Sequence, residues 1–157
     1  MLLERVDYGH RDALALIAEV QQEYVVRYGG TDDTPLDAAM FTPPTGSFFV
    51  GYDDGLAVCS GAWRRRSDVT VFETAATAEV KRMYVVPSHQ RRGLARVMLG
   101  HLEATARVAG AEAMVLETGA AQPEAIALYL TSGYRPIPGF GHYRDAPDNR
   151  CFAKSLV

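Results

Sequence analysis

Apolar side chains recur at helical spacing in three segments of the chain. These segments are residues 12–28, 94–109 and 122–132. Gly29 and Gly110 follow the first two, as expected at helix C-termini, and Pro123 suits the first turn of the third. The pattern therefore predicts three helices, with one more helical turn at residues 36–40, which makes about four helices in all.

Short apolar runs between these segments predict six or seven strands. The runs are residues 2–6, 47–52, 56–64, 78–86, 113–118, 134–137 and 150–154. Asp53-Asp54-Gly55 is a hairpin turn signal between the second and third runs. A helical crossover joins residues 80–86 to residues 113–118, so these two strands should be parallel. The expected fold is α/β (α+β), a mixed and mostly antiparallel sheet flanked by helices.

Composition limits the class of protein. With 157 residues, 48% of them hydrophobic, the chain is expected to form a single domain over residues 1–157. The net charge of −3 and the pI of about 5.8 argue against a nucleic-acid partner. We interpret Arg64-Arg65-Arg66 as a solvent-exposed strand end rather than a nucleic-acid patch.

The remaining composition favours a cytoplasmic protein. Cys59 and Cys151 lie in apolar runs, which is typical of reduced, buried thiols. No His/Cys spacing suggests a metal, so none is expected. No apolar stretch approaches 18 residues and the N-terminus is charged early, so neither a membrane span nor a signal peptide is expected.

Residues 80–95, VKRMYVVPSHQRRGLA, carry the most chemistry. They read as a strand, a basic turn and a helix N-terminus, which presents free backbone N–H groups to a phosphate. Gly93 allows close backbone approach, and Arg91 and Arg92 add positive charge. A pyrophosphate would lie on the N–H groups of residues 91–95. Neither G-x-x-x-x-G-K-[ST] nor G-x-G-x-x-G is present, which excludes the two common nucleotide loops.

This stretch resembles the Q/R-x-x-G-x-G/A loop of the GNAT superfamily of acyl-CoA-dependent N-acetyltransferases, with Ala95 where glycine is commoner. The resemblance covers nearly the whole chain and is most specific over residues 79–95 and 117–134. It implies the GNAT fold, with a splayed central parallel strand pair, and acetyl-CoA as co-substrate. The cofactor-binding residues that it implies are Tyr84, Val85, Val86, Gln90, Arg91, Arg92, Gly93, Leu94, Ala95, Arg96 and Gln122.

The resemblance also implies catalytic residues. Tyr129 lies in an A-x-x-L-Y-x-x-x-G-Y/F pattern and is the expected general acid. Spacing alone favours a core tyrosine with a satisfied hydroxyl, and the resemblance reverses that preference. Glu79 is the expected general base, directly or through water, against the alternative of an exposed strand-end carboxylate. Glu117 is the second candidate for the base. The Val85 N–H is the expected donor to the thioester carbonyl.

The acceptor is less well specified. The family fold implies that Tyr28, Phe41, Arg82, Glu117 and His142 lie near the acceptor. Such aromatic and charged side chains suit a small amine, including an amine that carries a carboxylate. The expected activity is therefore transfer of an acetyl group to the primary amine of a small molecule, by a monomer or homodimer. The alternatives are acetylation of a protein lysine or N-terminus, a non-catalytic acyl-CoA-binding module, and a domain that binds another phosphate compound.

Overall fold

A computed structural model describes residues 1–157 and contains seven strands, three α-helices and two 3₁₀ helices. In chain order these are β1 (Leu2–Val6), α1 (Arg11–Tyr28), η1 (Ala38–Phe41), β2 (Gly46–Asp53), β3 (Leu56–Arg65), β4 (Thr77–Val85), η2 (Pro87–His89), α2 (Leu94–Val108), β5 (Ala113–Gly119), α3 (Pro123–Thr131), β6 (Arg135–Ile137) and β7 (Asn149–Ser155). The expected order of elements is confirmed, and the expected single helical turn is η1.

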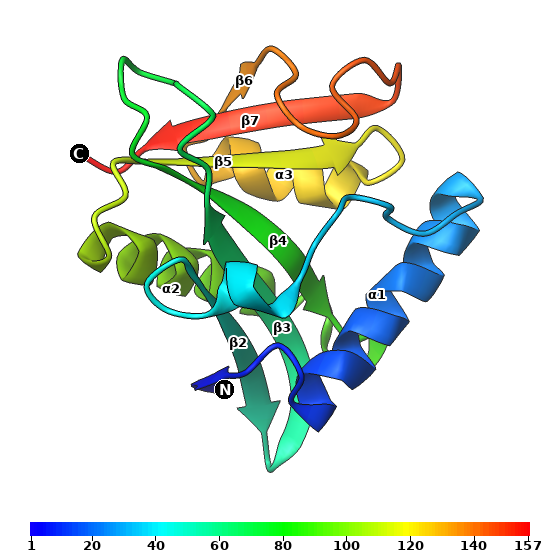
Figure 1. Ribbon diagram of the computed structural model, residues 1–157. Coiled ribbons are helices and arrows are strands. Elements are labelled where there is room, and N and C mark those ends of the chain that lie inside the picture. Colours follow the sequence, from blue (N-terminus) through cyan, green and yellow to red (C-terminus); the bar gives the residue numbers. More distant parts are fainter.

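The strands form one sheet in the order β1-β2-β3-β4-β5-β7-β6. Every neighbouring pair is antiparallel except β4 and β5, which are parallel as expected. Helix α1 and η1 cover one face, where they enclose a small core around Phe48 and Val50. Helices α2 and α3 pack on the opposite face over the larger core (Figure 1).

Helix α1 is fixed at both ends by local hydrogen bonds. The Nδ1 atom of His10 accepts from the backbone N–H of Asp12 at 3.1 Å. At the other end Gly29 adopts φ 79° and its N–H bonds to the carbonyl of Val25. Ala13, Leu16 and Val20 form the buried stripe of the helix, and its last turn projects beyond the sheet beside the end of β5.

Strands β4 and β5 separate soon after they meet. Their ladder joins residues 77–79 of β4 to residues 113–115 of β5 and goes no further. Opposite Gly61, the register between β3 and β4 shifts, and Arg82 adopts φ 56°. The Ser60 hydroxyl donates to the Arg82 carbonyl at 2.7 Å, which fixes this bulge. A bulge bends and twists its strand, and β4 visibly diverges from β5 after it (Figure 1).

Two expectations about side chains are wrong. Phe41 is 2% exposed and stacks on Tyr8 at 5.3 Å between ring centroids, so it is a core residue rather than a wall of the acceptor site. The second concerns the arginine run. Arg65 is exposed, but Arg64 and Arg66 are mostly buried because they pair with a buried carboxylate, described below. Both cysteines are free and buried, and no helix has the length and apolar character needed to span a bilayer.

Candidate active site

A cavity of about 690 Å³ opens where β4 and β5 separate. Its walls come from α1, β4, the loop before α2, β5 and α3, and its size is that of a ligand pocket. The predicted site residues that line it are Tyr28, Arg82, Tyr84, Val85, Gln90, Arg91, Gly93, Leu94, Ala95, Arg96, Glu117, Gln122 and Tyr129. Five predicted residues do not line it, namely Phe41, Glu79, Val86, Arg92 and His142.

The loop before α2 presents a row of free backbone donors. The N–H groups of residues 91–96 have no acceptor in the protein, and no side chain caps the helix. Arg91 and Gly93 adopt φ values of 62° and 78°, and such alternation turns successive N–H groups toward one point. The positive end of the α2 dipole lies at the same place. These features fit the pyrophosphate of an acyl-CoA.

Three side chains hold this loop in position. Gln90 donates from Nε2 to the carbonyl of Val85 at 3.0 Å. His89 pairs with Asp53 of the β2–β3 hairpin, at 2.9 Å between Nε2 and Oδ2. Arg96 donates to the hydroxyl of Thr131 at 2.8 Å, which ties the loop to the end of α3. The loop is therefore braced from β4, the hairpin and α3 before any ligand binds.

The free edge of β4 offers a donor to the cavity. The N–H of Val86 donates to the carbonyl of Val58 on β3 at 2.9 Å. Because backbone groups alternate along a strand, the N–H of Val85 points the other way, toward the gap between β4 and β5. Val86 therefore belongs to the sheet, whereas Val85 is free to bind a ligand.

Tyr129 presents an unpaired hydroxyl to the cavity. The residue is 6% exposed, and its ring packs against Tyr134 and Phe152 with centroids 5.8 and 6.2 Å away. Its hydroxyl makes no hydrogen bond within the protein, although the residue lines the cavity. Burial, followed by the nearby Tyr24, raises the pKa of this phenol, so it stays protonated across the neutral range. A held proton of this kind suits a general acid.

Glu79 is enclosed in an ion pair instead of facing the cavity. Its side chain is 1% exposed, and Oε1 accepts from Nε of Arg64 at 2.9 Å and from Nη1 of Arg66 at 2.8 Å. Arg66 also clasps Asp68 through Nε and Nη2, each at 2.9 Å. Two guanidinium groups therefore occupy the carboxylate of Glu79, and the residue does not line the cavity.

Glu117 on β5 is the carboxylate that faces the cavity. Its Oε1 is buried without a hydrogen-bond partner, and the side chain packs so tightly on Gly141 that a methyl group there would overlap it. Burial, and next the charge of Glu79, raise the pKa of Glu117, and Lys81 acts in the opposite direction. A carboxylate with a raised pKa and an unused oxygen is a stronger proton acceptor than an ordinary one.

One charged cluster in the cavity was not predicted. Asp32, in the loop after α1, accepts at Oδ2 from Arg82 Nη1 at 2.8 Å and from Lys81 Nζ at 3.3 Å. Burial alone would raise the pKa of Asp32, but Lys81, the hydrogen bonds from Thr34 and Arg82 together hold it well below its usual range. The adjacent cations Lys81 and Arg82 were visible in the sequence. Their partner was not, because it lies about fifty residues away along the chain.

Aromatic side chains of α1 form the wall opposite the strands. The rings of Tyr24 and Tyr28 are 6.4 Å apart. The Tyr28 hydroxyl accepts from Gln122 Nε2 at 3.2 Å, which joins α1 to the start of α3. Gly119 makes room for this contact, because a side chain there would overlap the Tyr28 ring. The predicted residue His142, in contrast, is exposed, stacks edge-on against Tyr143 and does not itself line the cavity.

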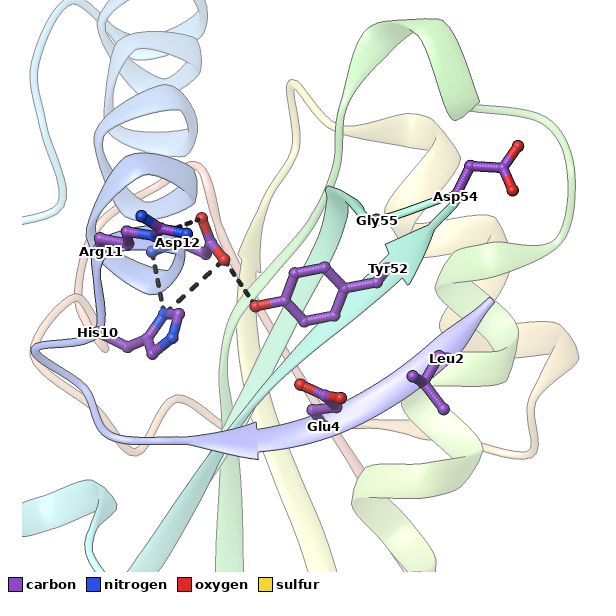
Figure 2. A pocket seen from close by; sticks show the side chains of 8 residues that line it. All are labelled: Leu2, Glu4, His10, Arg11, Asp12, Tyr52, Asp54 and Gly55. Carbon is purple, nitrogen blue, oxygen red and sulfur yellow. Dashed lines mark hydrogen bonds and ion pairs between the residues drawn. The ribbon is translucent and has the colours of Figure 1, made fainter.

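A second hollow, of about 570 Å³, lies beside β1 and the hairpin and is open to solvent. In Figure 2 the ring of Tyr52 reaches toward Asp12 at the start of α1, and its hydroxyl donates to Oδ2 at 2.7 Å. The backbone N–H of Asp12 also donates to Nδ1 of His10, which is the N-cap residue of α1. These polar groups satisfy one another and fix the N-terminus of α1. None of the predicted site residues lies there.

Together, a splayed parallel strand pair, a free N–H row and a buried hydroxyl define an acyl-CoA-dependent acyltransferase. Residues 14–134 match the family model described as "Acetyltransferase (GNAT) family". The chain belongs to this family, as its loop suggested. Members use acetyl-CoA, which is therefore the acyl donor.

Two similar proteins agree with this assignment, and a third shares the fold. A protein from Azospirillum brasilense named "IAA acetyltransferase" is 31% identical over 147 residues, which is 93% of this chain and 92% of that protein. The structure of a provisionally named acyl-CoA N-acyltransferase from Klebsiella pneumoniae subsp. pneumoniae MGH 78578 gives a TM-score of 0.79 at 28% identity, covering 99% of this chain and 97% of that one. A provisionally named acetyltransferase from Salmonella typhimurium, solved with its cofactor acetyl-CoA, gives 0.70 at 20% identity, covering 100% and 94%.

Proposed function

We propose that this protein is an N-acetyltransferase that acts on the primary amine of a small molecule. The observation that carries the proposal is the closure of the acceptor side of the cavity. The backbone N–H of Asp33 donates to the Tyr143 hydroxyl at 2.6 Å, which joins the loop after α1 to the β6–β7 loop. Arg27 donates to the carbonyl of Ala121 at 2.8 Å, which joins α1 to the loop before α3. A polypeptide that presents an internal lysine needs a groove open at both ends, and these two bridges would obstruct such a groove.

Tyr129 supplies the proton in this proposal. Acetyl-CoA brings the acetyl group as a thioester, and the new N–C bond forms as the C–S bond breaks. The departing sulfur, which has a thiol pKa near 8.5, is a better leaving group when a hydroxyl donates to it. The hydroxyl of Tyr129 is unpaired, protonated and inside the cavity, so it is available for that transfer.

Glu117 accepts the proton of the amine. An alkyl amine is mostly protonated at neutral pH, because its pKa is near 10, and it must lose a proton to attack. The expectation from sequence favoured Glu79. However, its Oε1 atom already accepts hydrogen bonds from Arg64 and Arg66, and the residue does not line the cavity. We assign Glu79 an indirect role, since its fixed negative charge raises the pKa of Glu117.

The backbone supports both binding and reaction. The N–H of Val85 is directed into the gap between β4 and β5, where it would donate to the carbonyl oxygen that gains charge during transfer. The N–H groups of residues 91–96 would hold the pyrophosphate. Arg91 lines the cavity at this point and adds charge, whereas Arg92 does not line it.

The test begins with ligand binding by thermal shift, using acetyl-CoA, CoA, ATP and NAD. A ligand at about 100 times its Kd stabilises a fold by roughly 2.7 kcal/mol, which gives a clear rise in Tm. We expect a rise with acetyl-CoA and CoA but not with ATP or NAD. Thiol release is then measured with a panel of primary amines and, in parallel, with lysine-containing and free N-terminal peptides.

The two panels separate the alternatives. Acetylation of small amines with little activity on peptides supports the proposal. Efficient acetylation of peptides alone would assign the protein to the protein acetyltransferases, and the proposed closure of the cavity would then be wrong. Binding of CoA without transfer to any acceptor would identify a non-catalytic acyl-CoA-binding module.

A further inference from the structure

Strand β4 contributes two cationic side chains to the cavity wall, and both pair with the same carboxylate, that of Asp32. Lys81 and Arg82 both line the cavity, and their side chains are only 9% and 4% exposed. Each makes one side-chain hydrogen bond, and in both cases the acceptor is Oδ2 of Asp32. Nε of Arg82 is buried with no partner at all. Two cations with eight N–H donors therefore share one carboxylate oxygen.

Asp32 cannot serve as the recognition group for an amine, because its acceptor sites are already occupied. Its Oδ1 accepts from the backbone N–H of Thr34 at 3.0 Å and from the Thr34 hydroxyl at 2.6 Å. With the two donors to Oδ2, the carboxylate receives four hydrogen bonds, which is about its full capacity. What remains available at this wall is a surplus of cationic donors.

The wall of the cavity formed by β5 contains a hydrogen-bond acceptor that has no donor. Glu117 lines the cavity from β5 and has a buried oxygen without a donor. Lys81, Arg82 and Glu117 line the same cavity, so the donor wall and the acceptor wall border one space. Of the other carboxylates that line the cavity, Asp33, Glu124 and Asp148 are exposed to solvent, and Glu23 pairs with Arg27. The rings of Tyr24 and Tyr28 close the third side.

We propose that the acceptor is a primary amine that also carries a carboxylate, as an amino acid does. The carboxylate would bind Lys81 and Arg82, the amine would lie at Glu117, and the hydrocarbon part would pack on Tyr24 and Tyr28. A diamine fits poorly, because its second ammonium group would face two cations. This inference rests on the proposed function and specifies the substrate class of the same site.

The experiment compares each amino acid with its decarboxylated counterpart, such as phenylalanine with phenethylamine and leucine with isoamylamine. Thiol release at saturating acetyl-CoA gives kcat/KM for each member of a pair. Charge-assisted hydrogen bonds to a buried anion predict that the carboxylate-bearing member is preferred by about 10- to 100-fold. The two members share the amine and the hydrocarbon, so the ratio isolates the carboxylate.

Substitution of the donors tests where the preference arises. Lys81→Met and Arg82→Gln should lower kcat/KM for the amino acid more than for the decarboxylated amine, so that the ratio between the two substrates falls. Lys154→Met is the matched control, because Lys154 pairs with Glu103 at 3.0 Å outside the cavity. Circular dichroism and acetyl-CoA affinity show which variants fold. If a variant does not fold, the ratio of kcat/KM values in the wild-type protein still shows whether the carboxylate is preferred.

Each outcome has one meaning. A preference for the carboxylate that falls in the Lys81 or Arg82 variants supports the inference. Acetylation of amines with no preference for the carboxylate, or a preference unchanged in both folded variants, overturns the inference and leaves the proposed function standing. If no amine of the panel is acetylated although acetyl-CoA raises the Tm, the proposed function fails, and the inference fails with it.

Discussion

Replacing Tyr129 by phenylalanine removes a single oxygen atom from the cavity. Because the hydroxyl has no hydrogen-bond partner in the protein and the ring contacts with Tyr134 and Phe152 remain, nothing in the fold loses a partner. The free energy of unfolding should therefore change by less than about 1 kcal/mol. Acetyl-CoA affinity should also be retained, since the pyrophosphate site lies on the loop before α2.

The effect should fall on the chemical step. A positioned general acid contributes about 10²- to 10⁴-fold, so kcat should drop by that factor, equal to roughly 2.7–5.5 kcal/mol in the barrier. The assay is thiol release at saturating acetyl-CoA and amine, with acetyl-CoA Kd measured by calorimetry. Tyr134→Phe is the matched control.

The control removes the same atom from a neighbouring ring. The Tyr134 hydroxyl donates to Glu103 Oε2 at 2.8 Å, away from the cavity. Its loss should lower the free energy of unfolding by about 1.5–3 kcal/mol, because the acceptor is charged, without a comparable fall in kcat. A Tyr129→Phe protein with the turnover and pH dependence of the wild-type protein would refute the role of Tyr129 as the acid.

Three further substitutions test other parts of the site. Glu117→Gln should abolish the rise of kcat/KM with pH that follows ionisation of Glu117. Because the pKa of Glu117 is raised in the folded protein, its ionisation opposes folding, so the variant should have a higher Tm at pH 7 and lose this advantage below the unfolded-state pKa of about 4.5. Asp32→Asn should lower the free energy of unfolding by about 3–5 kcal/mol, since it leaves two buried cations without a counter-ion. The lowered pKa of Asp32 means that its contribution is present above the unfolded-state pKa of 3.8 and is lost only at strongly acidic pH, so wild type and variant should converge there in chemical denaturation. Gly93→Ala should weaken acetyl-CoA binding in calorimetry, because a methyl group forced to φ 78° lies beside the N–H row. Gly110→Ala, at φ 99° and outside the cavity, should cost similar stability of about 1 kcal/mol without affecting acetyl-CoA.

The parts of the site that could be predicted are those encoded in continuous segments. A loop from strand to helix carries its own geometry, so the positions of Gly93 and its neighbours followed from their order in the chain. Tyr129 could be located because the surrounding pattern is local to one helix. In the same way, the periodicity of each helix and the single crossover were sufficient to predict the parallel pair and the order of elements.

The parts that could not be predicted depend on partners far away in the sequence. The alternation of β4 places Glu79 on one face, but only the register with β3 brings Arg64 and Arg66 onto its carboxylate. Phe41 was expected in the acceptor site because it follows α1, whereas packing against β2 buries it in the core. Asp32 has no periodic context, and its importance arises entirely from contact with β4.

The short ladder between β4 and β5 has a consequence for the cell. This three-pair connection is the only ladder between strands β1–β4 and strands β5–β7, so the sheet consists of two halves with a weak seam. The proposed binding groups are divided between them, with Val85 and the loop before α2 on one side and Tyr129 and Gln122 on the other. Acetyl-CoA would act as a brace across the seam and slow amide hydrogen exchange along the end of β4. The stability of the folded protein in the cell would then depend on the acetyl-CoA supply as well as on the temperature.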